Sequence, residues 1–313
     1  MTPLSVIICS HNPRPAALQA TLAALRLQTL PVRQWELLLI DNASATPLAD
    51  RFDCRWHPQG RQVTETRLGL THARLRGIAE AAGDILVFVD DDNVLAPDYL
   101  ENVLAVGLRH KSLGAWGGRV ELQFESEPAA WTRRYWHFLA RRDVDCDEMI
   151  CSTAMTGPFP VGAGMCLRKE VCAYYALQVA SSPVRRALGR VGENLTSAED
   201  TDLILTACDL GLQRGLVNCL HLFHLIPPER LTEAYLLRLA EGISFSSQVL
   251  AMSRSSMSAP PPTNWWWWLK FGCDCLLKRG YKRRFYLAEK RAQRRARKLF
   301  ESWPAGESHP PPP

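Results

Sequence analysis

The stretch from residue 85 to residue 93 constrains this chain most, because five apolar residues lead directly into three carboxylates. The run Ile85–Val89 is rich in β-branched residues, which predicts a strand buried on both faces, as in a parallel sheet. Asp90, Asp91 and Asp92 follow it and would repel one another unless a cation neutralised them. Oxygen ligands on a short turn suit Mg²⁺ or Mn²⁺. The alternative is an acidic first turn of a helix that begins near Pro97.

The first third of the chain alternates strand-like apolar runs with helical periodicity. Predicted strands occupy residues 4–10, 35–41 and 85–89, with a short extended piece at 54–57. Predicted helices occupy residues 14–28, 70–82 and 97–109. This rhythm predicts the α/β class, with a mostly parallel central sheet that has helices on both faces. Ligand-binding side chains are then expected at the carboxyl ends of the strands.

The rest of the chain is less regular but contains a boundary. Strands are predicted at 115–124 and 216–223, and helices at 128–142, 199–210 and 228–252. The segment 158–167 contains Gly162, Ala163 and Gly164, small residues that allow the backbone to approach its neighbours closely. The Ser/Pro-rich segment 253–263 predicts a linker that closes a main domain of residues 1–252. Beyond it we expect a tryptophan-rich, basic, helical segment over 264–300 and a disordered tail over 301–313.

The segment after the linker holds most of the positive charge. Residues 265–300 begin with four tryptophans and contain twelve Lys or Arg but only two acids. A partial apolar stripe runs along it at helical spacing, formed by Tyr281, Phe285, Leu287, Ala288, Ala292, Ala296 and Leu299. One interpretation is a helix lying on an anionic membrane surface, where tryptophans and cations are favourable. The other is that the tryptophans pack on the main domain and the cations form a solvated face. A third interpretation of basic residues with aromatics is nucleic-acid binding, which no other feature of the sequence supports.

The ends and hydropathy of the chain bear on its location. The first predicted strand follows the N-terminus directly, without a basic region before it, so no secretory signal peptide is expected. No window offers ~18 uninterrupted apolar residues, so no spanning helix is expected. These features predict a cytoplasmic protein, with the basic segment as its candidate contact with the inner membrane face.

Six motifs, taken together and in this order, resemble those of family 2 glycosyltransferases, which have the GT-A fold. They are VIICSHN at 6–12, LLIDNAS at 38–44, GLTHARLRG at 69–77, FVDDDN at 88–93, GAGM at 162–165 and SAEDTDL at 197–203. The resemblance runs over roughly residues 4–250. It implies a GT-A glycosyltransferase domain followed by the basic helical appendage.

The resemblance implies donor-binding roles for the ends of the first two strands and for the following helix. Ser10 and Asn12 would lie under the nucleotide base, and Asp41 would hydrogen-bond the base or the ribose. Asp-Asn-Ala-Ser is also good turn chemistry, so Asp41 is expected to shape a turn as well. Arg74 resembles the family's arginine near the diphosphate. Its alternative is a surface arginine that pairs with Glu80 or with water.

The resemblance also implies the metal site. Asp90 and Asp92 match the family's DxD motif, with Asp90 toward the ribose, Asp92 on Mn²⁺ or Mg²⁺, and Asp91 at the variable position of the donor site. His224 alternates with apolar residues along a predicted strand, which is more often the place of a core histidine. Related enzymes carry a histidine near this place, so His224 is a second candidate metal ligand, and Arg230 is a candidate for the phosphates.

The pair Glu199-Asp200 resembles the acids that precede a helix in this family, where Asp200 would be the general base. A carboxylate within hydrogen-bond reach is needed to deprotonate a sugar hydroxyl as it attacks the anomeric carbon. Its alternative is purely local, because Ser197 followed by Asp200 is also a capping-box pattern at a helix start.

Together these features predict an inverting, metal-dependent enzyme that transfers one sugar. The donor would be a nucleotide-diphosphate sugar and the acceptor a saccharide or a polyprenyl-linked saccharide, in surface polysaccharide biosynthesis. The chain has no Gln-x-x-Arg-Trp motif, which argues against a processive synthase. The alternative function is a non-catalytic nucleotide-sugar-binding or scaffold protein that its basic tail recruits to a membrane.

Overall fold

The first part of the chain folds largely as its sequence predicts. The computed structural model describes residues 2–152, 157–192, 194–254 and 278–301. Its first strands are β1 (Leu4–Ser10), β2 (Trp35–Asn42), β3 (Gly60–Glu65), β4 (Ile85–Val89) and β5 (Asn93–Leu95). The helices among them are α1 (Pro15–Arg26), η1 (Val32–Gln34), η2 (Leu48–Asp50), α2 (Leu70–Glu80) and α3 (Tyr99–Arg109).

The extended piece predicted at residues 54–57 is wrong. The His57 amide donates to the Cys54 carbonyl across 3.1 Å, so this segment turns back on itself. The turn places the rings of Trp56 and His57 against Trp35, with centroids 6.1 and 4.1 Å away. Aromatic packing therefore decides the backbone here, and the strand forms three residues later, as β3.

The three aspartates lie in a turn between two strands. Asp90–Asp92 connect β4 to β5, and the Asp90 amide donates to the Asn93 side chain across 3.1 Å. Helix α3 begins only at Tyr99, with Asp98 at its N-cap. The alternative of an acidic first helical turn is therefore wrong.

The second part of the chain contains more irregular structure. Its strands are β6 (Leu113–Phe124), β7 (Glu148–Cys151), β8 (Met165–Arg168) and β9 (Gln213–Ile226). Its helices are η3 (Ala130–Leu139), α4 (Lys169–Ser181), α5 (Pro183–Arg186), α6 (Glu199–Asp209), η4 (Pro228–Leu231), α7 (Glu233–Arg254) and α9 (Gly280–Glu301). The close approach expected of the small residues at 162–164 is seen at Gly164, which has φ of +68° and lies against the Tyr99 side chain. The helix predicted over 128–142 is the shorter 3₁₀ segment η3.

All these strands belong to one mixed sheet. The order is β3-β2-β1-β4-β8-β6-β9-β5, and β7 also pairs with β9. β3, β2, β1 and β4 are parallel, as predicted, whereas β8 runs antiparallel to both β4 and β6. The predicted α/β class is confirmed, with a parallel first half and a mixed second half.

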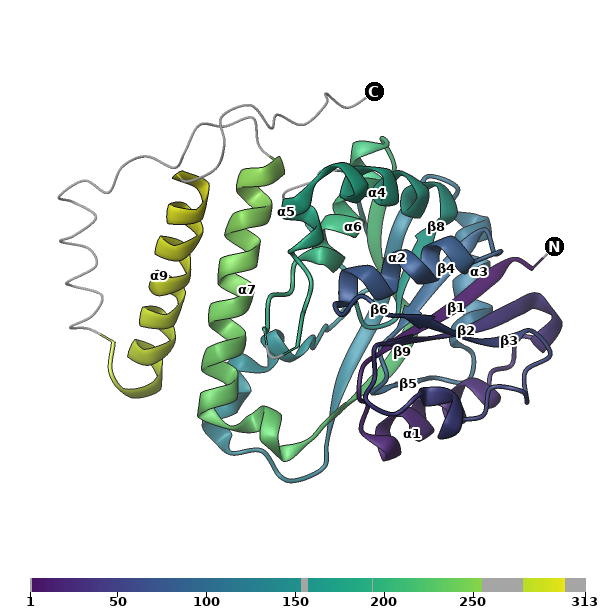
Figure 1. The fold of residues 1–313 in the computed structure, drawn as a ribbon, viewed down its shortest axis with the longest axis horizontal. Helices are drawn as coiled ribbons and strands as arrows, with labels where there is room; N and C mark the ends of the chain where they lie inside the picture. The colour runs from purple at the N-terminus through teal and green to yellow at the C-terminus, as the bar shows by residue number, and fades with distance from the viewer. Residues whose placement is uncertain (1, 153–156, 193, 255–277, 302–313) are drawn as a thin grey trace.

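Helices cover both faces of the sheet, which confirms that expectation (Figure 1). α1 and α3 pack on one face, over alternate β1 residues such as Val6 and Ile8. α2, α4 and α6 pack on the other face, over residues such as Ile7 and Phe88. Burial on both faces explains the continuous apolar runs, because no side of these strands meets water.

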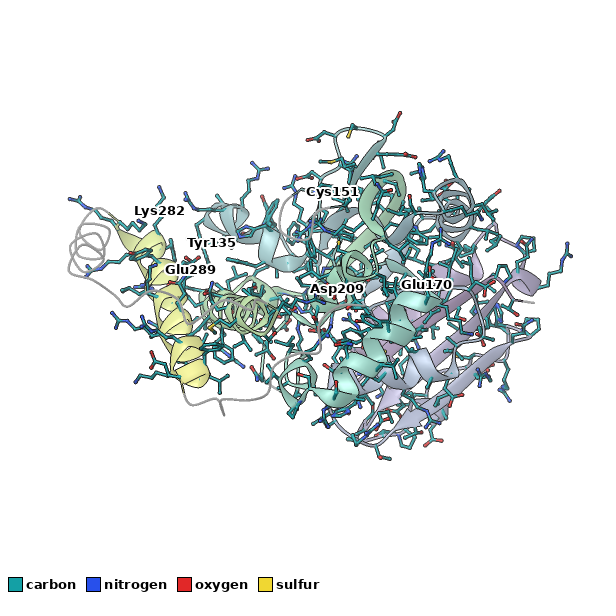
Figure 2. All side chains as sticks on the ribbon, turned by 90° about the horizontal axis from the view of Figure 1, so that it is seen from above. Tyr135, Cys151, Glu170, Asp209, Lys282 and Glu289 are labelled. Atoms are coloured by element: carbon teal, nitrogen blue, oxygen red, sulfur yellow. The ribbon has the colours of Figure 1, made fainter. Side chains whose placement is uncertain are left out.

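The C-terminal helix packs on the main domain rather than standing apart. α9 lies beside α7 at the edge of the molecule (Figure 1), and its buried face consists of Phe285, Ala288, Ala292 and Ala296. Phe285 stacks on Tyr135 of η3, with ring centroids 3.6 Å apart. In Figure 2 Tyr135 lies close to this helix, which carries the labelled Lys282 and Glu289. Most of the apolar stripe found in the sequence therefore already has an intramolecular partner.

Some sequence predictions fall outside the described residues. These are most of the linker 253–263, the tryptophans 265–268 and nearly all of the tail 301–313. Within the described ranges, no helix combines the length and apolar character needed to cross a bilayer.

Candidate active site

A cavity of about 740 Å³ opens at the carboxyl ends of the parallel strands. Ser10 at the end of β1 and His11 just after it line the cavity, β2 contributes Asn42, and the turn after β4 contributes the three aspartates. The opposite wall comes from segments much later in the sequence, namely η3, the loop 159–163, the start of α6, the end of β9 and α7. The sheet edge predicted to bind ligand is thus the floor of the cavity.

The three aspartates have different surroundings. The Asp90 side chain is 39 % exposed and lies 4.0 Å from Arg74. The Asp91 carboxylate accepts a hydrogen bond of 2.5 Å from the Ser10 hydroxyl, which ties the end of β1 to this turn. Burial, and next the charge of Asp92, raise the pKa of Asp91 to about 7. Asp91 therefore binds a proton more readily than Asp92 does.

Asp92 is buried but has two cationic or polar neighbours. Arg230 Nη1 lies 2.9 Å from Asp92 Oδ2, and His224 Nε2 lies 3.3 Å from Asp92 Oδ1. Burial alone would raise the pKa of Asp92, but the charge of His224, when its ring is protonated, and that of Arg230 outweigh burial and hold the pKa well below its usual range. Asp92 is therefore the carboxylate of the three that keeps its charge most firmly.

His224 is oriented by the wall opposite the aspartates. Its Nδ1 lies 2.9 Å from the Leu139 carbonyl, which can only accept, so Nδ1 carries the proton. In the neutral ring Nε2 then has its lone pair facing Asp92 and Arg230. A backbone carbonyl on the far nitrogen is the arrangement that orients metal-binding histidines.

These two side chains fit a divalent cation that takes its other ligands from a substrate. Among the described residues no group of three or more His, Cys, Asp or Glu could hold a metal by itself. Mg²⁺ and Mn²⁺ commonly bind through one or two protein side chains, with phosphate oxygens and water completing the shell. Asp92 and His224 lie close enough together to meet that requirement, with His224 Nε2 3.3 Å from Asp92 Oδ1.

Arg74 is a buried residue of the site, so its surface alternative is wrong. Its side chain is 4 % exposed, and Nη1 donates to Glu199 Oε1 across 3.0 Å. Glu80, the partner that alternative named, pairs instead with Arg61 and Arg76. Burial raises the pKa of Glu199 to about 7, although Arg74 opposes that rise. Arg74 thus joins the start of α6 to the aspartate turn.

Asp200 faces the cavity from the first turn of α6. Its Oδ2 accepts from the Gly162 amide across 3.0 Å, and its Oδ1 accepts from the Thr201 amide across 2.7 Å. A Cβ on Gly162 would lie 2.8 Å from Arg74 Nη2 and 3.2 Å from Asp200 Oδ2, so a larger residue here would crowd both side chains. The capping box is not formed, since α6 has Ala198 at its N-cap and no side-chain cap bond.

Asn12 and Asp41 shape the rim of the cavity rather than its lining. Asp41 accepts from the amides of Ser44 and Leu48, at 3.0 and 2.9 Å, which confirms the predicted turn. Asn12 has φ of +47° and its side chain accepts from the Ala45 amide across 2.8 Å. Neither residue lines the cavity, and their contact with a nucleotide stays a prediction.

Several lining residues escaped the sequence analysis. Arg142 and Arg190 bring further cations, and Tyr235, Leu239 and Ile243 of α7 bring an apolar wall. Among the described residues Arg190 makes no side-chain hydrogen bond or ion pair, so it is available to an anionic ligand. These residues lie in loops or in a long helix without motif character. Gly189 and Gly192 around Arg190 were the one local signal of a special loop.

The comparisons with known proteins identify the family. The chain belongs to glycosyl transferase family 2, whose model matches residues 5–173, just over half of its length. A stretch of 107 residues is 34 % identical to polypeptide N-acetylgalactosaminyltransferase 8 of Drosophila melanogaster, covering 33 % of this chain and 18 % of that protein. Another of 174 residues is 26 % identical to an N-acetylglucosaminyltransferase of Sinorhizobium fredii, covering 52 % of this chain. The chain spans well under half the length of both relatives, 18 % and 39 %.

Solved structures show that the fold is GT-A. The mannosyltransferase PcManGT from Pyrobaculum calidifontis, in complex with GDP-Man and Mn²⁺, superposes with a TM-score of 0.56 at 19 % identity, over 96 % of this chain and 74 % of that one. GalNAc-T7 with UDP, GalNAc and Mn²⁺ gives 0.52 at 15 % identity, over 87 % and 54 %. S. aureus TarS 1–349 with UDP-GlcNAc gives 0.51 at 14 % identity, over 82 % and 68 %.

Proposed function

We propose that this protein transfers one sugar from a nucleotide-diphosphate sugar to a saccharide or lipid-linked acceptor, with inversion at the anomeric carbon. The observation that carries the proposal is the shared cavity of Asp92, His224 and Asp200, three side chains from distant parts of the sequence. The family supports it, and so do neighbours of the same fold that hold UDP, UDP-GlcNAc or GDP-Man.

Asp200 acts as the general base in this proposal. The acceptor hydroxyl oxygen forms a bond to the anomeric carbon, the bond from that carbon to the diphosphate breaks, and the hydroxyl proton passes to Asp200. The Gly162 and Thr201 amides orient the carboxylate that receives the proton. Attack on the face opposite the diphosphate inverts the configuration.

Asp92 and His224 would hold Mn²⁺ or Mg²⁺, and a divalent ion bound there would supply positive charge to neutralise the negative charge that develops on the leaving diphosphate. Arg190 and Arg230 line the same cavity and contribute positive charge to the diphosphate. Ser10 and Arg74 keep the aspartate turn in place, and Asp90 faces the ribose. Glu199 holds Arg74 beside the base Asp200. Two neighbours of the same fold were solved with Mn²⁺, which supports a divalent cofactor.

The basic helix α9 supports the further proposal that this protein contacts an anionic membrane surface on the cytoplasmic side. Its apolar face packs on α7, which leaves an exposed face of cations, namely Lys282, Arg283, Arg284, Arg291, Arg294, Arg295 and Lys298. Clustered cations near anionic lipids gain about 1 kcal/mol each. Such contact suits an acceptor carried on a polyprenyl lipid, in surface polysaccharide assembly. Co-sedimentation with anionic but not neutral vesicles is expected, and equal sedimentation would contradict it.

Thermal shift of the purified chain against UDP-, GDP- and dTDP-sugars tests the donor site. We expect stabilisation by one nucleotide class with Mn²⁺ and loss of that stabilisation with EDTA. If no donor shifts the transition, the donor site is wrong. If a donor binds but the D200N variant retains full function in cells, the non-catalytic scaffold is the correct reading.

A further inference from the structure

Arg230 lies directly against both side chains proposed as metal ligands. Its Nη1 is 2.9 Å from Asp92 Oδ2 and 3.1 Å from His224 Nε2. In the neutral ring of His224, Nδ1 carries the proton toward the Leu139 carbonyl, so Nε2 presents a lone pair to which the guanidinium N–H donates. One cationic nitrogen thus uses the same two acceptors that a divalent ion would need.

The burial of Asp92 explains why a cation is needed there at all times. Its side chain is 6 % exposed, and a buried carboxylate without a counter-ion is costly. Arg230 meets this need from a short turn, since it belongs to η4 between β9 and α7 and its side chain is 25 % exposed. A long side chain on such a turn can leave Asp92 without disturbing the sheet.

We propose that Arg230 is the resident counter-cation of Asp92 and His224 and competes with the divalent ion for them. The donor diphosphate binds beside the same guanidinium. Its negative charge draws Arg230 away from Asp92 and His224, which leaves both side chains open to the metal. Metal and donor diphosphate then bind with positive coupling. The diphosphate removes the free-energy cost of displacing Arg230 from the metal site, and the metal removes the cost of leaving Asp92 without a cation. This inference rests on the proposed function, since it requires both ligands to bind in this cavity.

Binding of Mn²⁺ alone to the full chain tests this competition, measured by the loss of the free-ion electron paramagnetic resonance signal. Removing one positive charge at this distance should tighten Mn²⁺ binding to R230M and R230Q by about tenfold or more relative to wild type. R230K keeps the charge and should tighten Mn²⁺ binding less than R230M and R230Q do. R61M removes an arginine that pairs with Glu36 and Glu80 outside the cavity, and it should also bind like wild type.

A stability measurement provides the second readout. Without Arg230 the Asp92 carboxylate lacks its cation, so R230M in EDTA should melt below wild type and gain more from Mn²⁺ than wild type gains. Competition is overturned if R230M and R230Q bind Mn²⁺ no more tightly than wild type, which leaves the metal site intact. If D92N binds Mn²⁺ as wild type does, the metal site itself is wrong, and this inference is overturned with it.

Discussion

The two walls of the cavity are built in different ways. The wall that carries Ser10 and the three aspartates consists of strand ends, and those strands are buried on both faces by helices. The other wall, η3 and α7, rests on a separate apolar cluster that includes Tyr135, Leu239 and Phe285. The first wall is therefore as stable as the core. The second depends on docking of a helix from the far end of the described chain.

The largest expected effect breaks the chemistry without changing either wall. D200N removes the proposed base and keeps the shape, so transfer should fall by about 10³-fold while donor binding is retained. Radiolabelled sugar transfer and donor titration measure the two quantities. D145N, at an exposed aspartate outside the cavity, is the matched control. Retained transfer in D200N would exclude Asp200 as the base.

Next in size is the removal of a proposed ligand from the strand wall. D92A should weaken Mn²⁺-dependent donor binding by about 100-fold, since the ligand and its charge are both lost. The measurement is calorimetric titration of the donor with and without Mn²⁺. D53A removes an exposed carboxylate that pairs with Arg55 and should leave binding unchanged. Identical titrations for D92A and D53A would place the metal elsewhere.

A substitution that weakens the helical wall should leave the stability of the strand wall unchanged. Phe285 is 3 % exposed, and F285A should weaken the docking of α9 by about 3 kcal/mol. Hydrogen exchange should then speed up in α9 and η3 but not in β1 and β4. L299A, at a residue 45 % exposed on the same helix, is the control. Equal loss of protection in all four elements would show that the walls unfold together.

A smaller effect is expected where the walls meet. A Cβ at residue 162 would crowd Arg74 and Asp200, at 2.8 and 3.2 Å. G162A should therefore lower kcat by about tenfold through misplacement of the base, with little change in donor affinity. Steady-state kinetics with varied donor and acceptor measure this. An unchanged kcat would mean that the side chains move aside without cost to the reaction.

The smallest effect is a dependence of stability on pH. Because burial raises the pKa of Glu199 to about 7, the folded state binds more protons than the unfolded state between about pH 4.5 and 7. Wild type should lose stability relative to E199Q as the pH rises through that window, by on the order of 1 kcal/mol. Urea unfolding at several pH values measures the difference. A constant difference would show that Arg74 keeps Glu199 ionised throughout.

The strand wall could be predicted from the sequence because its signals are local. The strands over residues 4–10 and 85–89 were predicted at their observed bounds, and Asp90–Asp92 at the following turn. The wrong predictions at residues 54–57 and 128–142 share a physical cause, which is packing against elements distant in the sequence. Trp56 and His57 form a turn because Trp35 packs on them, and η3 is a 3₁₀ segment whose buried residues meet α7 and α9.

The α/β class, the parallel first half of the sheet and the residue types at its edge could be predicted from the sequence, because apolar runs and turn residues act over a few neighbours. Which of those residues meet was decided by the tertiary structure. Arg74 reaches Glu199 across 125 residues, and His224 is oriented by Leu139 across 85. It also decided that the apolar face of α9 has a partner within the chain. Contacts at such separations depend on how whole elements pack, and no local pattern encodes that packing.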